Sequence, residues 1–133
     1  MQSALGIVNL KYIDEIIADR VKKYQYYYSA LSSNPDIRFQ KIEFGTTNYS
    51  YFPIILENKK KLFKIIDQLN NYNIYPRRYF YPSVNIFKNI VESDKVEVSE
   101  RVANHILCLP LFYDLDFDMI DKIINVINSK VWK

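Results

Sequence analysis

The first thirty residues repeat apolar positions at helical spacing, which predicts one long helix over residues 3–29. The apolar positions form two neighbouring rows: Leu5, Val8, Tyr12 and Ile16 in one, and Ile13, Ile17, Val21, Tyr24 and Tyr28 in the other. Charged residues cover the remaining face: Asp14, Glu15, Asp19, Lys22 and Lys23. Two rows make a wide apolar face for a helix at the surface of a small domain. Either the helix contacts a second body, or it lies across its own sheet and its aromatic side chains widen the core.

Two short segments after this helix alternate in hydrophobicity, which predicts strands. The first covers residues 37–43, and the second covers residues 49–56 beyond a loop at residues 45–48. Pro53 lies inside the second segment. Because proline has no backbone donor, Pro53 indicates an edge strand or a bulge.

Three more helices are expected, each after a residue of the N-capping type: 59–71 after Asn58, a short helix from Ser99 to about His105, and a last one from Asp116 to about Asn128. An asparagine at position 70, 71 or 73 can end the first of these in the left-handed conformation. The apolar run Ile106–Leu109 stops at Pro110 and predicts a buried strand. This order of elements predicts a single α+β domain over residues 1–133, with helices on one face of a small, mainly antiparallel sheet.

The stretch Tyr75–Pro82 joins two arginines and four aromatic residues, and Pro76 and Pro82 lie near its two ends. Its β-forming residues predict a short strand near a sheet edge. Alternation along a strand would place Arg77, Tyr79 and Tyr81 on one face and Arg78 and Phe80 on the other. An arginine fork suits phosphate or carboxylate, and a nearby tyrosine can stack or donate a hydrogen bond. The stretch is either an edge strand with solvated arginines or a strand that presents them to an anionic ligand.

Composition narrows the classes of function. The net charge of +3 permits an anionic ligand without predicting a nucleic-acid partner, and two glycines are too few for a glycine-rich phosphate loop. The single cysteine, Cys108, excludes an internal disulfide and fits a reducing compartment, so we expect a cytoplasmic protein. No apolar run is long enough to span a membrane.

Catalytic and metal chemistry have little support in the sequence. His105, the only histidine, is expected at a helix end, and Cys108 is expected to be buried and inert. One histidine with one cysteine does not make a metal site. We therefore expect no catalytic and no metal-binding residue in this chain.

Three segments, in this order, resemble the DegT-type sugar-nucleotide aminotransferases. Residues 2–20 are similar to the family's "lqAALGl-qL--ld--i--R" helix, residues 76–83 to its "tR-yfyPl" strand, and residues 102–111 to its "a--il-LPly" segment. The final helix is also similar to the family's last helix. The resemblance implies the small C-terminal domain of a fold-type-I enzyme, with residues 1–30 as a long helix that makes interdomain and dimer contacts. Met1 stands inside the helix motif, so we expect a C-terminal fragment of a longer protein.

Enzymes of this family use pyridoxal 5′-phosphate (PLP) to move an amino group, usually from glutamate, onto a nucleotide-linked keto-sugar. The family's serine–lysine motif, which carries the Schiff-base lysine, is absent here, so the resemblance implies no cofactor in this chain and no activity by itself. It also implies that Arg78, Tyr79, Tyr81 and, less directly, Asn85 contact the sugar nucleotide of the intact enzyme, and that the chain forms a homo-oligomer through its first helix. The alternative is a stand-alone α+β module that binds a nucleotide or single-stranded nucleic acid. Nucleic acid is the weaker alternative, because the aromatic residues concentrate in one strand and glycine is scarce.

Overall fold

The computed structural model describes residues 2–89 and 94–129, so Met1 and Lys133 lie outside the described residues. Its elements are helix α1 (Gln2–Leu10), helix α2 (Ile13–Leu31), strand β1 (Ile37–Phe39), strand β2 (Phe52–Leu56), helix α3 (Lys59–Asn71), the 3₁₀ turn η1 (Val84–Ile86), helix α4 (Glu97–His105), strand β3 (Ile106–Leu109) and helix α5 (Phe117–Asn128). The three strands form one antiparallel sheet in the order β1–β2–β3. The predicted α+β class with a small antiparallel sheet is confirmed.

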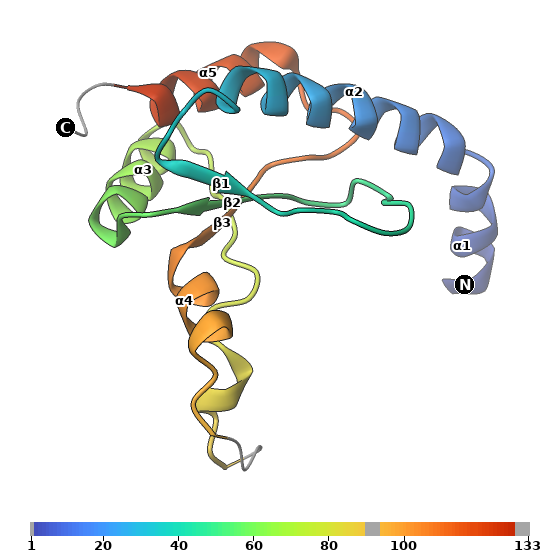
Figure 1. Cartoon of the computed structure of the whole chain (residues 1–133). Helices are drawn as coiled ribbons and strands as arrows, with labels where there is room; N and C mark the ends of the chain where they lie inside the picture. Colours follow the sequence, from blue (N-terminus) through green and yellow to red (C-terminus); the bar gives the residue numbers. More distant parts are fainter. Residues whose placement is uncertain (1, 90–93, 130–133) are drawn as a thin grey trace.

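One face of the sheet carries the core. Phe52, Ile54 and Leu56 of β2 are buried and alternate with half-buried Pro53 and Ile55. Leu107 and Leu109 of β3 lie opposite Ile54 and Phe52, so they extend the same face. The core continues into α2, α3 and α5 through Tyr27, Leu31, Leu62, Ile65, Leu69, Ile120, Ile123 and Ile127. Figure 1 shows α2 and α5 side by side across the sheet, which agrees with the predicted helical layer.

Pro53 lies in the central strand, where the sequence suggested an edge or a bulge. The pairing of β1 with β2 ends at Phe39 and Ile54, so Pro53 has a strand neighbour only on its β3 side. Its missing N–H is tolerated because no strand pairs with it on the other side.

The long N-terminal helix is divided in two. Lys11 and Tyr12 donate to the carbonyls of Val8 and Asn9, both at 3.1 Å and three residues back, and α2 begins after this tight turn. The two strands are also shorter than the alternation suggested. Tyr49 adopts a left-handed φ of 51°, which is unfavourable for a non-glycine residue and interrupts the extended backbone before β2.

The remaining helices lie close to the predicted bounds. The side chain of Asn58 accepts hydrogen bonds from the backbone of Lys60 (2.8 Å) and Lys61 (3.3 Å), which confirms it as the cap of α3. Asn73, at φ 59°, supplies the expected left-handed residue after α3. Helix α4 begins at Glu97, so Ser99 lies in its first turn and does not cap it.

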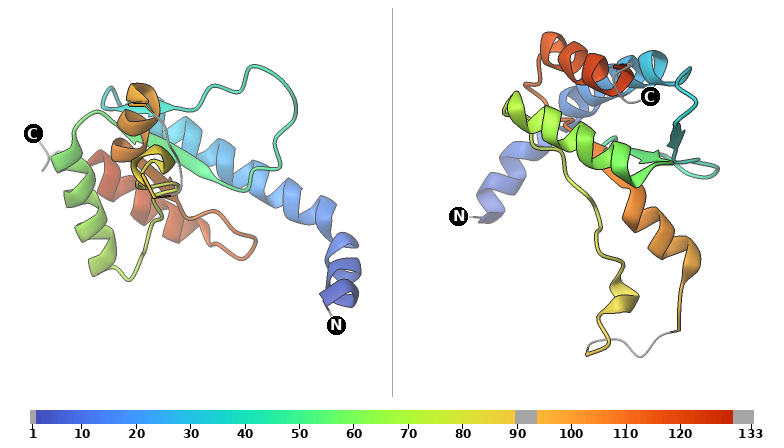
Figure 2. Two further views of the ribbon diagram at one scale, coloured as in Figure 1. Left: turned by 90° about the horizontal axis from the view of Figure 1, so that it is seen from below. Right: turned by 90° about the vertical axis from the view of Figure 1, so that its left-hand side faces the viewer.

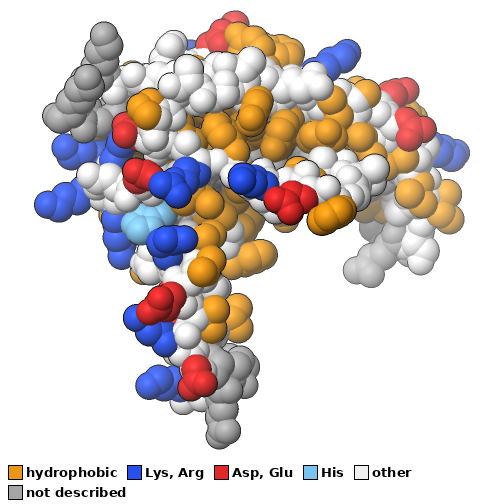
Figure 3. Space-filling view, viewed as in Figure 1, with side chains coloured by type: hydrophobic (Ala, Val, Ile, Leu, Met, Phe, Trp, Pro, Cys, Tyr) orange, Lys and Arg blue, Asp and Glu red, His pale blue; other side chains and the backbone are white. Residues whose placement is uncertain are grey.

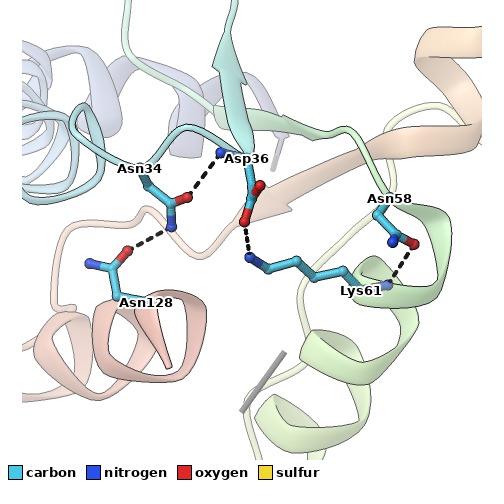
Figure 4. A network of polar contacts seen from close by, with 5 residues as sticks. All are labelled: Asn34, Asp36, Asn58, Lys61 and Asn128. Carbon is cyan, nitrogen blue, oxygen red and sulfur yellow. Dashed lines mark hydrogen bonds and ion pairs between the residues drawn. The ribbon is translucent and has the colours of Figure 1, made fainter. Parts of the chain in front are cut away.

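A polar network fixes the start of α3 against its neighbours (Figure 4). The ammonium of Lys61 pairs with Asp36 at 2.6 Å, and Asn34 joins the turn before β1 to Asn128 of α5 at 2.8 Å. Asn34 also accepts from the backbone of Asp36 at 3.1 Å. The network therefore ties three elements that are distant in the sequence.

Two parts extend away from the sheet: α1 at one side (Figures 1 and 2), and α4 with the η1 segment below it in Figure 1 and in the right-hand view of Figure 2. The apolar side chains of α1 are largely exposed, with Leu5 at 63% and Leu10 at 67% of full exposure. Figure 3 shows apolar side chains gathered at this end and beneath α2. No helix in the described part of the chain has the length and apolar character needed to cross a membrane.

Candidate functional site

The segment Tyr75–Pro82, here called the Arg–Tyr segment, leaves the sheet after one residue. Arg77 pairs with Cys108 of β3 through two backbone hydrogen bonds, of 3.1 Å from its N–H and 2.6 Å to its carbonyl. A turn follows, in which the N–H of Tyr81 donates to the carbonyl of Arg78 at 2.9 Å. The predicted strand is therefore wrong beyond Arg77, and the expected alternation of faces does not hold.

Arg78 packs against the end of α4. Its Nη2 donates to the carbonyls of Ala103 (3.0 Å) and Asn104 (2.9 Å), in the last turn of that helix. A positive charge at the C-terminus of a helix stabilises the helix, because it interacts favourably with the helix dipole. The guanidinium lies over the ring of Tyr81 at 3.7 Å from the centroid and near Phe63 at 5.6 Å. Of the four predicted contact residues, Arg78 therefore joins the segment to α3 and α4, and Tyr81 covers the guanidinium of Arg78.

Asn85 belongs to a polar network at the start of α4. It donates to Glu100 at 2.7 Å and accepts from Ser83 at 2.6 Å, and the hydroxyls of Ser83 and Ser99 lie 2.8 Å apart. The same carboxylate of Glu100 accepts a hydrogen bond of 3.2 Å from the N–H of Val96, the residue before α4. Glu100 therefore stabilises the start of α4, the role that the sequence suggested for Ser99. Asn85 thus holds η1 against α4.

This network borders a hollow of about 620 Å³, here called the α4 hollow. Its other lining residues are aromatic or aliphatic: Tyr79, Phe80, Val84, Val96, Val102, Ala103 and Ile106. Among the described residues that line it, none is charged. It suits an uncharged group that can bury apolar surface.

A second hollow, of about 490 Å³, lies on the other side of the Arg–Tyr segment and is here called the Arg77 groove. The Arg–Tyr segment, the residue before β2 and the chain after β3 form its walls. Tyr79 lines both hollows, and its ring meets that of Tyr51 edge to face at 5.3 Å. Of the predicted contact residues, only Tyr79 lies in this groove.

Side chains of α2 anchor the wall that follows β3. Lys23 donates to Asp19 (2.5 Å) and to the carbonyls of Phe112 (3.1 Å) and Tyr113. The hydroxyl of Tyr27 donates to the carbonyl of Pro110 at 3.2 Å. Lys23 is 3% exposed, so its predicted place on the charged outer face is wrong. The three hydrogen bonds from Lys23 and Tyr27 to the carbonyls of Pro110, Phe112 and Tyr113 are here called the α2 clasp.

The two residues with reactive side chains lie as expected. His105 is the last residue of α4, and its Nδ1 lies 3.0 Å from the carbonyl of Arg101. Burial raises the pKa of the Cys108 thiol, and a hydrogen bond from the backbone of Tyr79 partly offsets this. Residues 2–89 and 94–129 contain no group of three or more His, Cys, Asp or Glu side chains suited to a metal ion.

The sequence model of the DegT/DnrJ/EryC1/StrS aminotransferase family matches residues 1–128. The chain belongs to this family. Two curated relatives are dTDP-4-amino-4,6-dideoxy-D-glucose transaminases: that of Shigella dysenteriae is 31% identical over 97% of this chain and 37% of its own length, and that of Escherichia coli is 29% identical over 98% and 38%. The chain therefore spans less than two fifths of the relatives it matches.

Solved structures of other aminotransferases share the fold. The aminotransferase TlmJ from Streptoalloteichus hindustanus superposes with a TM-score of 0.82 at 19% identity, over 92% of this chain and 33% of that one. PseC of Helicobacter pylori superposes with a TM-score of 0.78 at 19% identity, over 95% and 35%. At this identity the likeness shows the fold alone.

The family is PLP-dependent, and its chemistry requires a lysine amine. No lysine of the described part of the chain lines the α4 hollow or the Arg77 groove. The ammonium of buried Lys23 is already held by Asp19 and two carbonyls, and Lys61 is paired with Asp36. Neither hollow therefore offers a described lysine for a covalent PLP site. The expectation that this chain holds no cofactor stays a prediction.

Several residues of the site were missed from the sequence. Lys23 shows only an i, i+4 relation to Asp19, and Tyr27 was not singled out at all. Tyr51 precedes β2 and looks like an ordinary strand residue. Their roles depend on partners far along the chain, for which the sequence gives no local signal.

Proposed function

We propose that this chain is the C-terminal part of a PLP-dependent aminotransferase that acts on nucleotide-linked keto-sugars, with glutamate as the amino donor. The family match over residues 1–128 carries this proposal. The name of the Shigella dysenteriae relative indicates a dTDP-linked amino sugar, which fits the same class of substrate.

By itself, the chain is inactive in this proposal. The part of the relatives that it does not cover would supply the lysine and the PLP phosphate site. Incubation of the purified chain with PLP, followed by borohydride reduction, should leave no lysine labelled in stoichiometric amount. One fully labelled lysine would contradict this part of the proposal.

Arg78, Tyr79, Tyr81 and Asn85 stay the proposed substrate-binding residues, in two different ways. Tyr79 lines both hollows and is the residue best placed to touch a ligand. Arg78, Tyr81 and Asn85 act mainly by holding the Arg–Tyr segment and η1 against α4. Their effect on a substrate would then be indirect.

A chimera tests the function directly. Residues 2–128 replace the matching region of the Shigella dysenteriae relative, and transfer of the amino group from glutamate to the dTDP-linked keto-sugar is measured. We expect activity in the chimera and none in the isolated chain. A second chimera with Phe52→Asp, which disrupts the core, controls for activity that does not need the grafted region. A well-folded chimera that binds PLP but transfers no amino group would contradict the proposal.

We also propose that the chain forms a homo-oligomer through α1 and the start of α2. Leu5, Val8 and Leu10 are exposed, and apolar patches of this kind favour association. Sedimentation should show an oligomer that Leu5→Glu with Leu10→Glu converts to a monomer, whereas Phe44→Glu, at an exposed site in the 40–51 connection, leaves it intact. A monomer at high concentration would contradict this. The cytoplasmic location stays a prediction.

A further inference from the structure

We propose that the 40–51 connection, which joins β1 to β2, docks on the part of the enzyme that this chain does not cover, with Phe44 as its anchor. This inference rests on the proposed function, because it takes the chain to be one part of a longer aminotransferase. It adds a docking surface that the proposed function does not name. The connection reaches away from the sheet beneath α2, toward the end of the molecule that carries α1 (Figure 1).

The connection is long for its place in the fold. β1 and β2 are antiparallel neighbours, and the twelve residues 40–51 lie between them. Adjacent antiparallel strands are usually joined by about 2–5 residues, and much longer connections without secondary structure are mostly functional or disordered. The chain bends at Phe44 and Gly45, where Gly45 adopts a left-handed φ of 82°. Phe44 is 92% exposed, more than any other large apolar side chain of the described residues.

One limb of the connection is braced and the other is free. The side-chain oxygens of Thr47 and Asn48 each accept from the backbone N–H two residues further on, at 3.2 Å and 3.1 Å. The ring of Tyr49 meets that of Tyr24 on α2 edge to face at 5.0 Å. Residues 41–46 are all exposed and form no hydrogen bond with any described residue. The braced limb therefore supports a limb whose backbone groups are available to an incoming body.

A groove of about 560 Å³, here called the Ile17 groove, lies between this limb and α2. Its described lining residues are aliphatic or polar: Ile17, Gln40, Ile42, Thr46, Thr47 and Asn48. None of them is charged, so the groove does not favour nucleic acid or another charged partner. Ile13, 38% exposed, lies one turn before Ile17, so the groove continues the exposed apolar face of α1 and the start of α2. An aliphatic segment whose backbone bonds to the amides of Gln40 and Asn48 fits this lining.

The small size of the surface indicates which body covers it. Phe44 and Ile42 offer one phenyl ring and one branched side chain, whereas stable association of separate molecules usually buries roughly 1,200–2,000 Å² in total. A domain of the same polypeptide meets the connection at a high effective concentration, so a small contact is enough. This chain spans 37% of the Shigella dysenteriae relative, and the remaining length is ample for such a domain. We therefore assign the surface to that remaining part.

Replacing Phe44 with serine tests the inference in the isolated chain and in the chimera described above. In the isolated chain, Phe44→Ser should leave the midpoint of thermal unfolding unchanged, because the ring is 92% exposed. In the chimera the same change should lower the midpoint by about 4 °C, because the ring is then buried. Tyr72→Ser, at a 56% exposed residue after α3, is the matched control and should show no such difference. Hydrogen exchange of residues 41–46 should be at least about tenfold slower in the chimera than in the isolated chain.

Two results would overturn the inference: an equal effect of Phe44→Ser in the two proteins, or equally fast exchange of residues 41–46 in both. A change in the oligomer of the isolated chain on Phe44→Ser would assign the surface to a second copy and would also overturn it. Activity of the chimera separates this failure from failure of the proposed function. An active chimera with an unprotected connection rejects the docking surface alone, and an inactive chimera with Phe44-dependent protection rejects the proposed function alone.

Discussion

Replacing Lys23 with methionine should destabilise the fold by removing the charged part of the α2 clasp. Lys23 is 3% exposed, and its ammonium serves Asp19 and the carbonyls of Phe112 and Tyr113. Methionine keeps most of the apolar stem, so it removes hydrogen bonds and charge without opening a large cavity. The perturbation therefore isolates the polar contribution.

The size of the effect follows from two opposing terms. A hydrogen bond from a charged donor contributes about 1.5–3 kcal/mol, and two loop carbonyls lose such a donor. Phe112 and Tyr113 are 51% and 48% exposed, so water can partly replace it. Removing a buried charge also recovers some desolvation energy. We expect a net loss of about 2 kcal/mol, which corresponds to about 8 °C in the midpoint of thermal unfolding for a domain of this size.

Urea and thermal unfolding of the two proteins measure this loss. Lys22→Met, at the exposed neighbouring position, is the matched control and should change stability by less than about 0.5 kcal/mol. Hydrogen exchange adds a local readout, because the amide of Leu115, which donates to the carbonyl of Phe112, should lose protection when the clasp is weakened. Equal stability of the Lys23 and Lys22 variants would show that the clasp contributes nothing and would refute the reasoning.

Three other outcomes are expected. Phe52→Ala should cost about 3–5 kcal/mol in urea unfolding, because Phe52 is 1% exposed and contacts the rings of Tyr24 and Tyr27; a loss below about 1 kcal/mol would contradict the assigned core. Asn58→Ala should cost about 1 kcal/mol through the lost cap of α3, and Asn58→Asp, which keeps the acceptor, should restore it. The thiol of Cys108 should react slowly with a disulfide reagent at pH 8 and quickly in urea. Because folding raises the pKa of this thiol, its contribution to stability is complete below the unfolded pKa of about 8.5 and declines as the pH rises beyond it, a decline that Cys108→Ala should reduce.

The sequence predicted an element well where its apolar pattern matched the face that is buried in the structure. The repeat Leu62, Ile65 and Leu69 faces the core, and Asn58 caps the helix that carries it, so the bounds of α3 were found from the sequence. The apolar run Ile106–Leu109 likewise predicted a buried strand, and it forms β3 beside β2. In both elements periodicity and capping pointed to the arrangement that the tertiary contacts also favour.

The Arg–Tyr segment shows why the candidate site was harder to predict. Its composition favours a strand, but Arg78 bonds to carbonyls 25 and 26 residues further along the chain. That contact draws the backbone away from β3 after Arg77. Lys23 was misplaced for the same reason, since its carbonyl partners lie 89 and 90 residues away. The sequence singled out the segment that carries the candidate site, and it could not show that Arg78 bonds to α4 whereas Arg77 does not.

Helix α2 links the two surfaces on which the proposals depend. Its first half continues the exposed apolar face of α1, whereas Lys23 and Tyr27 in its second half hold the loop at residues 110–113. That loop forms part of the Arg77 groove through Pro110, Leu111 and Phe112. A body that covers α2 itself would restrain this wall of the groove, because Lys23 and Tyr27 join α2 to the loop, whereas the turn at Lys11 and Tyr12 separates α1 from α2.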